Sequence, residues 1–313
     1  MVDPTTYAMH GYRITSSIEL PGAPLGDGPA EIVVDAEACR PVALDAPRGR
    51  VLGQSTSTDA HRGWSLAEQA GGYLFRISGM CEFVISPDLR SVQCVRDPSI
   101  DPAMMGILIV GNLINVILTL DGKLGLHASA VVERQTDTAV AFVGDRGWGK
   151  STSAALLCAR GARMLTDDLL RVDLIDGRAV AYRGTLEPRL RDSAPSILTA
   201  NVDVGIGRTV DGRTALQVEA CQADRVELLR IAVPLLSDSA RVTSRRASAS
   251  EALLSLSGLA RLVLTDAVLQ TQQFHLTASL VEAIDVTIVN IPVSGVSSSA
   301  LADELYDCVF ASA

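Results

Sequence analysis

The residues from Gly144 to Ser151 are the part of this sequence most able to do chemistry. They read Gly-Asp-Arg-Gly-Trp-Gly-Lys-Ser and fit the pattern G-x-x-x-x-G-K-[ST]. Glycines let backbone N–H groups curl around phosphate oxygens, and a helix N-terminus adds partial positive charge. Lys150 can then reach the β- and γ-phosphates, and the Ser151 hydroxyl can ligate Mg²⁺. The sequence therefore predicts a nucleoside triphosphate site formed by Gly144, Asp145, Arg146, Gly147, Trp148, Gly149, Lys150, Ser151 and Thr152.

Asp167 and Asp168 form a second candidate group, one predicted helix and one predicted strand after the loop. That interval can bring a carboxylate to the sheet edge beside the γ-phosphate. One of these carboxylates can hold Mg²⁺, directly or through water, and the other can accept the proton of an attacking hydroxyl. The alternative is an ordinary acidic turn before the next strand.

His127 is the third candidate, on the strand predicted before the loop strand. If these two strands pair as a hairpin, the imidazole can lie near the phosphates. A lone histidine in an apolar strand is more often a satisfied core residue, so the pattern alone favours that alternative.

A strand before the loop and a helix after it must position these groups. Ala139–Val143 is a short apolar run typical of a buried strand, and Ser151–Arg160 is a helix-like segment that ends at Gly161. Asp176-Gly177 predicts a tight hairpin turn. Further strands are expected at Leu124–Glu133, Arg163–Thr166, Leu169–Ile175, Arg178–Tyr182, Thr214–Val218, Val226–Val233 and Val286–Ile291, and further helices at Ala252–Leu264, Asp266–Ala283 and Ser298–Val309.

Short β-like runs separated by Pro, Gly and Asp clusters fill the first hundred residues. We therefore expect a β-rich N-terminal domain at residues 1–100 and a catalytic domain at residues 101–313. The segment Ala103–Leu120 is almost entirely apolar, but it is shorter than about twenty residues and contains Asn112 and Asn115. It is predicted to be a buried core helix rather than a membrane span. The β runs expected in the N-terminal domain are Glu31–Val34, Arg50–Leu52, Tyr73–Ser78, Glu82–Ser86 and Val92–Val95.

The composition narrows the range of partners. The 313 residues carry a formal net charge of -9 at pH 7, which argues against nucleic acid or an anionic membrane as the main partner. The six cysteines are scattered singly and suggest reduced thiols. The N-terminus lacks the basic start and apolar core of a signal peptide, so a cytoplasmic location is expected.

Three runs together resemble the catalytic domain of HPr kinase/phosphorylase and its wider kinase family. They are Leu126–Val131 (LHASAV), Gly144–Thr152 (GDRGWGKST) and Arg160–Asp168 (RGARMLTDD). The resemblance implies an α/β fold with α+β character, namely a P-loop kinase domain with a mixed sheet of the HPr kinase/PEP carboxykinase type. It also implies ATP and Mg²⁺ as cofactors and a serine hydroxyl as acceptor. Carried over residue by residue, it makes Asp168 the general base, with His127 and Lys150 as further catalytic groups and Ser151 as the metal-binding hydroxyl. Asp167 is then the carboxylate expected to serve Mg²⁺.

The sequence departs from that family at several positions. Arg146 replaces a serine and Trp148 an aliphatic residue of the loop, and Ala181 stands where a glutamate serves Mg²⁺. The layout looks more like stand-alone relatives, some of which phosphorylate the C-terminal serine of lasso precursor peptides. Nearby arginines are candidates for phosphate or substrate contact, although a solvated arginine-rich loop is an equal alternative. They are Arg183, Arg189 and Arg191.

The expected function is therefore an ATP- and Mg²⁺-dependent serine kinase acting on a peptide or protein. Two alternatives stay open, a kinase of a small hydroxylated metabolite such as free serine and a non-catalytic nucleotide-binding regulator. The family's hexamers provide a precedent for a homo-oligomer.

Overall fold

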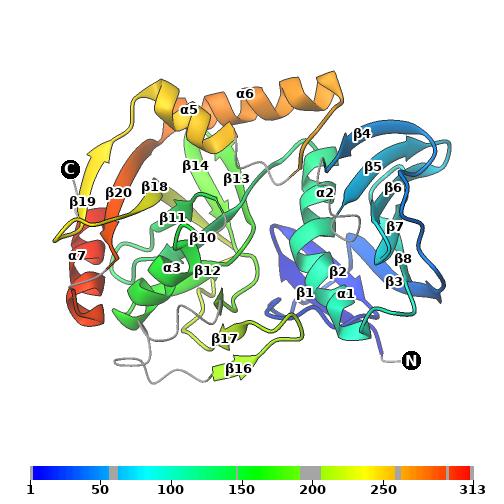
Figure 1. The fold of residues 1–313 in the computed structure, drawn as a ribbon, viewed down its shortest axis with the longest axis horizontal. Helices are drawn as coiled ribbons and strands as arrows, with labels where there is room; N and C mark the ends of the chain where they lie inside the picture. Colours follow the sequence, from blue (N-terminus) through cyan, green and yellow to red (C-terminus); the bar gives the residue numbers. More distant parts are fainter. Residues whose placement is uncertain are drawn as a thin grey trace. The chain divides into compact units, whose positions relative to one another are not determined.

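The computed structural model describes residues 3–55, 63–145, 147–190, 206–257, 262–293 and 296–310. The chain divides into two compact units, each of which is described by itself. Unit 1 comprises Met1–Lys123 and Arg261–His275, and unit 2 comprises Leu124–Ala260 and Leu276–Ala313. The two units together form a mixed α/β protein (Figure 1).

Unit 1 is built on an eight-stranded mixed sheet with the order β1-β2-β3-β8-β7-β6-β5-β4. Each of the five expected β runs overlaps a strand, with Glu31, Ser78 and Ser86 lying just outside. Three further strands, β1, β2 and β5, were not expected. The turn between β1 and β2 uses His10 and Gly11 at positive φ, which is not one of the usual hairpin dipeptides. The strands are β1 (Thr5–Met9), β2 (Tyr12–Ser16), β3 (Ile32–Cys39), β4 (Arg50–Gln54), β5 (Trp64–Gln69), β6 (Gly72–Ile77), β7 (Cys81–Ile85) and β8 (Ser91–Arg96).

The apolar segment after β8 is helical, as α1 (Pro102–Leu108), a π-helical stretch η1 (Ile109–Leu113) and α2 (Ile114–Leu120). Asp101 caps its start, because the carboxylate accepts from the N–H of Ala103 at 2.9 Å. By length and composition this is the one helix among the described residues that could cross a membrane, and 72% of its most apolar window is buried inside the structure.

The unit boundary lies at Lys123/Leu124 rather than at the expected 100/101. A Cβ at Gly106 would lie 2.1 Å from the carbonyl oxygen of Glu19, so this helix packs tightly on unit 1. The residues around Leu264 also join this unit. Leu264 forms a bridge with Gly53, and the N–H of Thr265 donates to the carbonyl of Leu52 at 2.8 Å. Contacts between residues so far apart in the sequence cannot be predicted from local sequence patterns.

Unit 2 is organised around a nine-stranded mixed sheet with the order β12-β10-β11-β18-β14-β13-β9, in which β20 pairs with both β18 and β19. The β11·β18 and β18·β20 pairs are parallel. A three-stranded sheet, β15-β17-β16, lies apart from it. The strands are β9 (Leu124–Leu126), β10 (Ala128–Val132), β11 (Ala139–Val143), β12 (Arg163–Thr166), β13 (Leu170–Ile175), β14 (Arg178–Tyr182), β15 (Arg189–Leu190), β16 (Ile206–Arg208), β17 (Thr214–Leu216), β18 (Arg225–Ser237), β19 (Thr243–Arg246) and β20 (Asp285–Pro292).

Both faces of this sheet are covered, which explains why β11 is apolar without alternation. Val140 and Phe142 pack with residues of α3 and α7, whereas Ala141 and Val143 pack with residues of α5 and α6. A strand buried on both sides reads as a continuous hydrophobic run. The helices are α3 (Lys150–Ala159), α5 (Ala249–Ser257), α6 (Ala267–Ala283) and α7 (Ser298–Phe310).

Two expected elements differ in the structure. The run Leu124–Glu133 is not one strand, because it breaks at His127 into β9, which pairs with β13, and β10, which pairs with β11 and β12. The described part of helix α5 is Ala249–Ser257, and Leu264, which was expected at the end of this helix, instead forms the bridge with Gly53. The hairpin at Asp176-Gly177 is confirmed, with φ of 50° and 77°.

Candidate functional site

The loop between β11 and α3 is closed around the side chain of Lys150. The Nζ of Lys150 donates to the carbonyl oxygens of Gly144 at 2.8 Å and Asp145 at 3.0 Å, and the side chain is buried. Gly147 and Gly149 adopt φ of 95° and 87°, a region that favours glycine. The expected order of strand, turn and helix is thus present, with the lysine held at the first residue of the helix.

Trp148 fixes the loop from its other side. Its ring packs against the core on the α5 and α6 face of the sheet. A Cβ added to Gly144 would lie 2.8 Å from Cε3 of that ring, closer than real Cβ atoms come to other atoms. The ring of Trp148 therefore leaves no room for a side chain at position 144, and it restricts the path of the backbone that follows β11.

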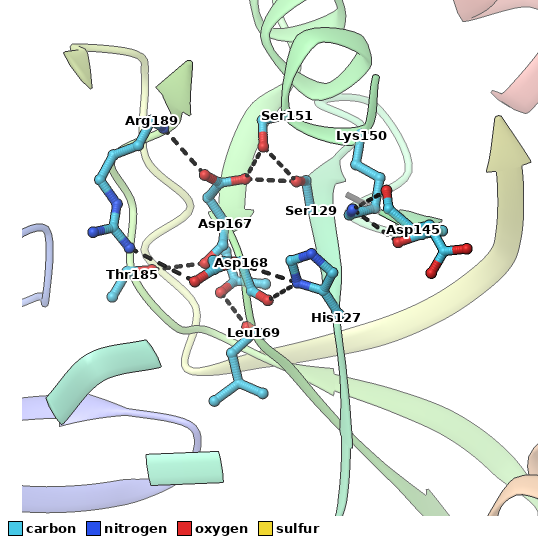
Figure 2. A network of polar contacts seen from close by, with 12 residues as sticks. His127, Ser129, Asp145, Lys150, Ser151, Asp167, Asp168, Leu169, Thr185 and Arg189 are labelled. Carbon is cyan, nitrogen blue, oxygen red and sulfur yellow. Dashed lines mark hydrogen bonds and ion pairs between the residues drawn. The ribbon is translucent and has the colours of Figure 1, made fainter. Parts of the chain in front are cut away.

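Asp167 lies in the turn between β12 and β13 and gathers hydrogen bonds from three elements (Figure 2). Its Oδ1 accepts from the hydroxyl of Ser151 in α3 at 2.8 Å and from that of Ser129 in β10 at 2.5 Å. Its Oδ2 accepts from the backbone N–H of Arg189 in β15 at 3.1 Å. Only 3% of Asp167 is exposed. The carboxylate is therefore buried and is joined by a hydrogen bond to the start of the loop helix.

Asp168 adopts φ of 75°, a left-handed conformation that Asp and Asn tolerate better than most residues. The Nδ1 of His127 lies 2.9 Å from its carbonyl oxygen and 3.3 Å from its Oδ1. A carbonyl oxygen only accepts, so Nδ1 carries a proton. The guanidinium of Arg189 approaches the other carboxylate oxygen, with Nη2 3.8 Å from Oδ2. His127, which lies between β9 and β10, thus contacts both the backbone and the side chain of Asp168.

Backbone pairing with Thr185 holds the acidic turn in place. The N–H of Asp167 donates to the carbonyl of Thr185 at 2.8 Å, and the Thr185 hydroxyl donates back to the carbonyl of Asp167 at 2.8 Å. Within the turn, the hydroxyl of Thr166 donates to the carbonyl of Leu169 at 2.6 Å. These bonds leave both carboxylates of the turn to interact with side chains from other elements.

Most of the residues expected to form the site lie in one neighbourhood. His127, Ser151, Asp167, Asp168 and Arg189 share the contacts described above, and Figure 2 shows Lys150 and Asp145 beside them. Thr152 lies in the first turn of α3 and is half-buried.

One arginine of the expected set lies elsewhere and two cannot be placed. Arg183 pairs with Asp224, with Nη2 2.6 Å from Oδ1, and donates to the carbonyl of Gln222. The contacts of Arg183 thus involve neither acid of the pair. Arg146 and Arg191 lie outside the described residues.

The sequence did not identify Ser129 and Thr185 as site residues. Ser129 is fully buried in a strand whose neighbours are apolar. A buried hydroxyl needs a hydrogen-bond partner, and that requirement was the signal available in the sequence. Thr185 carried no comparable signal, since it acts mainly through its position beside the turn.

The oxygen donors here suit a magnesium ion that arrives with a nucleotide. No group of three or more His, Cys, Asp or Glu side chains able to hold a metal lies within the described part of the chain. Mg²⁺ is usually held by one or two protein oxygens together with phosphates and waters. A carboxylate has about four acceptor positions, and Asp167 uses three of them. Asp167 and Ser151 therefore fit the ion, with one acceptor position left.

Comparison with known proteins adds little to this geometry. No protein-family model matches the chain, and no curated protein matches it. Among solved structures, the chain is similar to the Hpr(Ser) kinase/phosphatase from Coxiella burnetii, with 12% sequence identity and a TM-score of 0.28. That match covers 55% of this chain and 87% of the other. A likeness of this size carries no argument.

Proposed function

We propose that this protein is an ATP- and Mg²⁺-dependent kinase that transfers the γ-phosphoryl group to a serine hydroxyl of a peptide or protein. The observation that carries the proposal is the 2.8 Å hydrogen bond from Ser151 to Asp167, because it joins the lysine-containing loop to a pair of carboxylates. Phosphoryl transfer needs both parts, one to hold the phosphates and one to serve the metal and the attacking hydroxyl.

In the proposed reaction, the acceptor oxygen forms a bond to the γ-phosphorus. The bond from that phosphorus to the β–γ bridging oxygen breaks, and its electron pair leaves with ADP. The hydroxyl proton passes to the carboxylate of Asp168. His127 holds the carbonyl and Oδ1 of Asp168, so the base is oriented before the acceptor arrives. Atoms and charge balance without any further reactant.

Lys150 and the backbone amides at the start of α3 counter the charge of the β- and γ-phosphates. In the described structure, Nζ of Lys150 donates to two loop carbonyls, which keeps the ammonium within the turn that would receive the phosphates. Ser151 and Asp167 would hold Mg²⁺, which when bound neutralises developing charge on the phosphate oxygens. Each part expected of the reaction thus has a residue with suitable chemistry.

The assignment of a peptide acceptor rests on the sequence resemblance to stand-alone kinases of peptide precursors. A direct test uses γ-labelled ATP, Mg²⁺ and three acceptors: a peptide that ends in serine, the same peptide ending in alanine, and free L-serine. We expect label on the first peptide only. Asp168→Asn should lower the rate by about a hundredfold or more while ATP still binds.

Other outcomes have defined meanings. Label on free serine but not on the peptide would make the protein a kinase of a small hydroxylated metabolite. Tight ATP binding with no transfer to any acceptor would favour a nucleotide-binding regulator. Full activity of Asp168→Asn would show that Asp168 is not the base.

A further inference from the structure

Arg189 combines burial with incomplete hydrogen bonding. Only 6% of its side chain is exposed. Its backbone N–H donates to Asp167, and its Nη2 lies 3.8 Å from Oδ2 of Asp168. Its Nη1 is buried and has no hydrogen-bond partner among the described residues. This arginine therefore contacts both acids and keeps donors unused.

Three other arginines, Arg163, Arg183 and Arg230, also have a buried guanidinium nitrogen without a hydrogen-bond partner among the described residues, but their printed contacts involve neither acid of the pair. Arg189 is distinguished by having its unused donor beside Asp168. A guanidinium group keeps its charge under all ordinary conditions and carries five N–H donors in a fixed plane. A separation of 3.8 Å lets Asp168 attract the charge without making a hydrogen bond. Leaving a buried charged donor unpaired destabilises a protein, and such a donor is completed by a water, an ion or a ligand. Beside the candidate phosphate site, an anionic ligand is the partner that suits the charge of Arg189.

Arg189 and Lys150 lie on opposite sides of the acid pair (Figure 2). In the proposed reaction the lysine contacts the phosphates of the nucleotide, whereas Asp168 contacts the acceptor. A general base must lie about 2.6 to 3.2 Å from the oxygen whose proton it removes. In the product that oxygen is bonded to phosphorus. As the phosphoryl group moves from the nucleotide to the acceptor, it therefore moves away from Lys150 and toward Arg189.

We propose that Arg189 is a catalytic residue whose free guanidinium donors bind the oxygens of the phosphoryl group during transfer. This inference rests on the proposed kinase function and assigns to it a second phosphate-binding cation, opposite the loop. Arg189 only donates hydrogen bonds, and its own covalent bonds are unchanged. The charge of the phosphoryl group is spread over three oxygens, which suits the planar fork of a guanidinium.

The contact is stronger for the phosphoryl group in transit than for ATP at rest. An interaction made mainly in the transition state raises kcat, whereas one made equally with bound substrate lowers KM. Removing the guanidinium should therefore lower kcat and leave the affinity for ADP unchanged. A role limited to supporting the acidic turn would weaken nucleotide binding and kcat together.

The test measures binding of MgADP by calorimetry, with and without aluminium fluoride, at fixed ionic strength. Aluminium fluoride mimics the phosphoryl group in transit and needs no acceptor. We expect it to tighten ADP binding to the wild-type protein. Arg189→Gln should lose about tenfold or more of that tightening, with ADP alone binding as before. Arg189→Lys should keep part of it, because a point charge remains without the fork.

Arg230→Gln provides a matched control for the loss of a buried guanidinium. Arg230 is buried in β18, and its Nη1 donates to the carbonyls of Cys308 at 3.2 Å and Val309 at 3.3 Å, near the end of α7. Its contacts involve no residue of the candidate site. The variant should lower the thermal midpoint and keep the full effect of aluminium fluoride.

The inference is overturned if Arg189→Gln keeps the full tightening, or if it weakens ADP alone as much as ADP with aluminium fluoride. It is also overturned if the wild-type protein binds ADP but aluminium fluoride has no effect. A wild-type protein that does not bind ADP would refute the proposed function and the inference together. An Arg189-dependent tightening without labelling of any serine peptide would refute only the acceptor assignment.

Discussion

The hydroxyl of Ser129 donates a 2.5 Å hydrogen bond to Oδ1 of Asp167, and both residues are buried. The same oxygen accepts from Ser151 at 2.8 Å. Three segments, β10, the β12–β13 turn and the start of α3, therefore meet at one carboxylate oxygen. The position of the acid pair relative to the loop depends on these two hydroxyls.

Ser129→Ala should lower the free energy of unfolding by about 1.5 to 3 kcal/mol, because a buried hydrogen bond to a charged group is lost. Denaturation by urea measures the change. Ser153→Ala is a suitable control, since Ser153 is also buried and is not among the residues that hydrogen-bond to Asp167. Equal effects of the two substitutions would show that the contact with Asp167 contributes nothing specific.

The left-handed backbone of Asp168 makes the choice of substitution important. Asn tolerates φ of 75°, whereas Ala in that conformation costs about 1 to 2 kcal/mol. Asp168→Asn should lose kinase activity with little change in unfolding free energy, and Asp168→Ala should lose both. Parallel rate and urea measurements separate the two effects. Equal stability of the two variants would contradict the role of the backbone.

Gly144→Ala should disturb the loop through Trp148. The new Cβ would lie 2.8 Å from the ring, and overpacking of this kind typically costs about 1 to 3 kcal/mol. ADP affinity should fall with it, because the backbone before α3 must shift. Adding Trp148→Leu should restore part of both losses. If the double variant is as weak as Gly144→Ala alone, the ring is not the obstacle.

Helix α5 should contribute a pH-dependent term to stability. Hydrogen bonds from Arg245 and from the backbone and hydroxyl of Ser248 lower the pKa of Glu251 from 4.5 to about 2. A depressed folded-state pKa stabilises the protein above pH 4.5, and this stabilisation is lost as the pH falls toward 2. The thermal midpoint of the wild-type protein should exceed that of Glu251→Gln at pH 7 and converge with it in acid.

A difference between those midpoints that stays constant with pH would exclude the capping contact as its source. The contact is reciprocal, since Ser248 N–H donates to Glu251 Oε2 at 2.9 Å and Glu251 N–H donates to Ser248 Oγ at 3.3 Å. Arg245→Gln removes the hydrogen bond that lowers the pKa of Glu251 the most, while leaving the cap with Ser248. In this variant, the pH at which the stabilisation is lost should lie closer to the ordinary pKa of a glutamate.

Cys158 should resist alkylation in the folded protein. Burial, with further contributions from the charges of Asp167 and Glu219, raises its pKa to about 12, so little thiolate forms near neutral pH. Cys39 is free and exposed. Brief treatment with iodoacetamide followed by mass spectrometry should modify Cys39 before Cys158. Early labelling of Cys158 would mean that the loop helix opens readily.

The local elements around the site could be predicted because their signals are local. The apolar run of β11 and the pair Asp176-Gly177 each depend on residues close in sequence. The segment that contains His127 was expected to be one strand, since most of its residues are apolar. The sequence could not reveal the break, because β9 and β10 pair with different partners.

The sequence by itself determined which residues could do chemistry, namely the lysine-containing loop, the two acids and His127, since residue type and spacing are local properties. The tertiary structure alone decided how they are connected. It placed Ser129 and Ser151 on one oxygen of Asp167, directed Arg183 to Asp224, and left Arg189 beside Asp168 with a free donor. These contacts depend on strand pairing between distant segments. A hydrogen bond or an ion pair forms only where the fold brings its two atoms together.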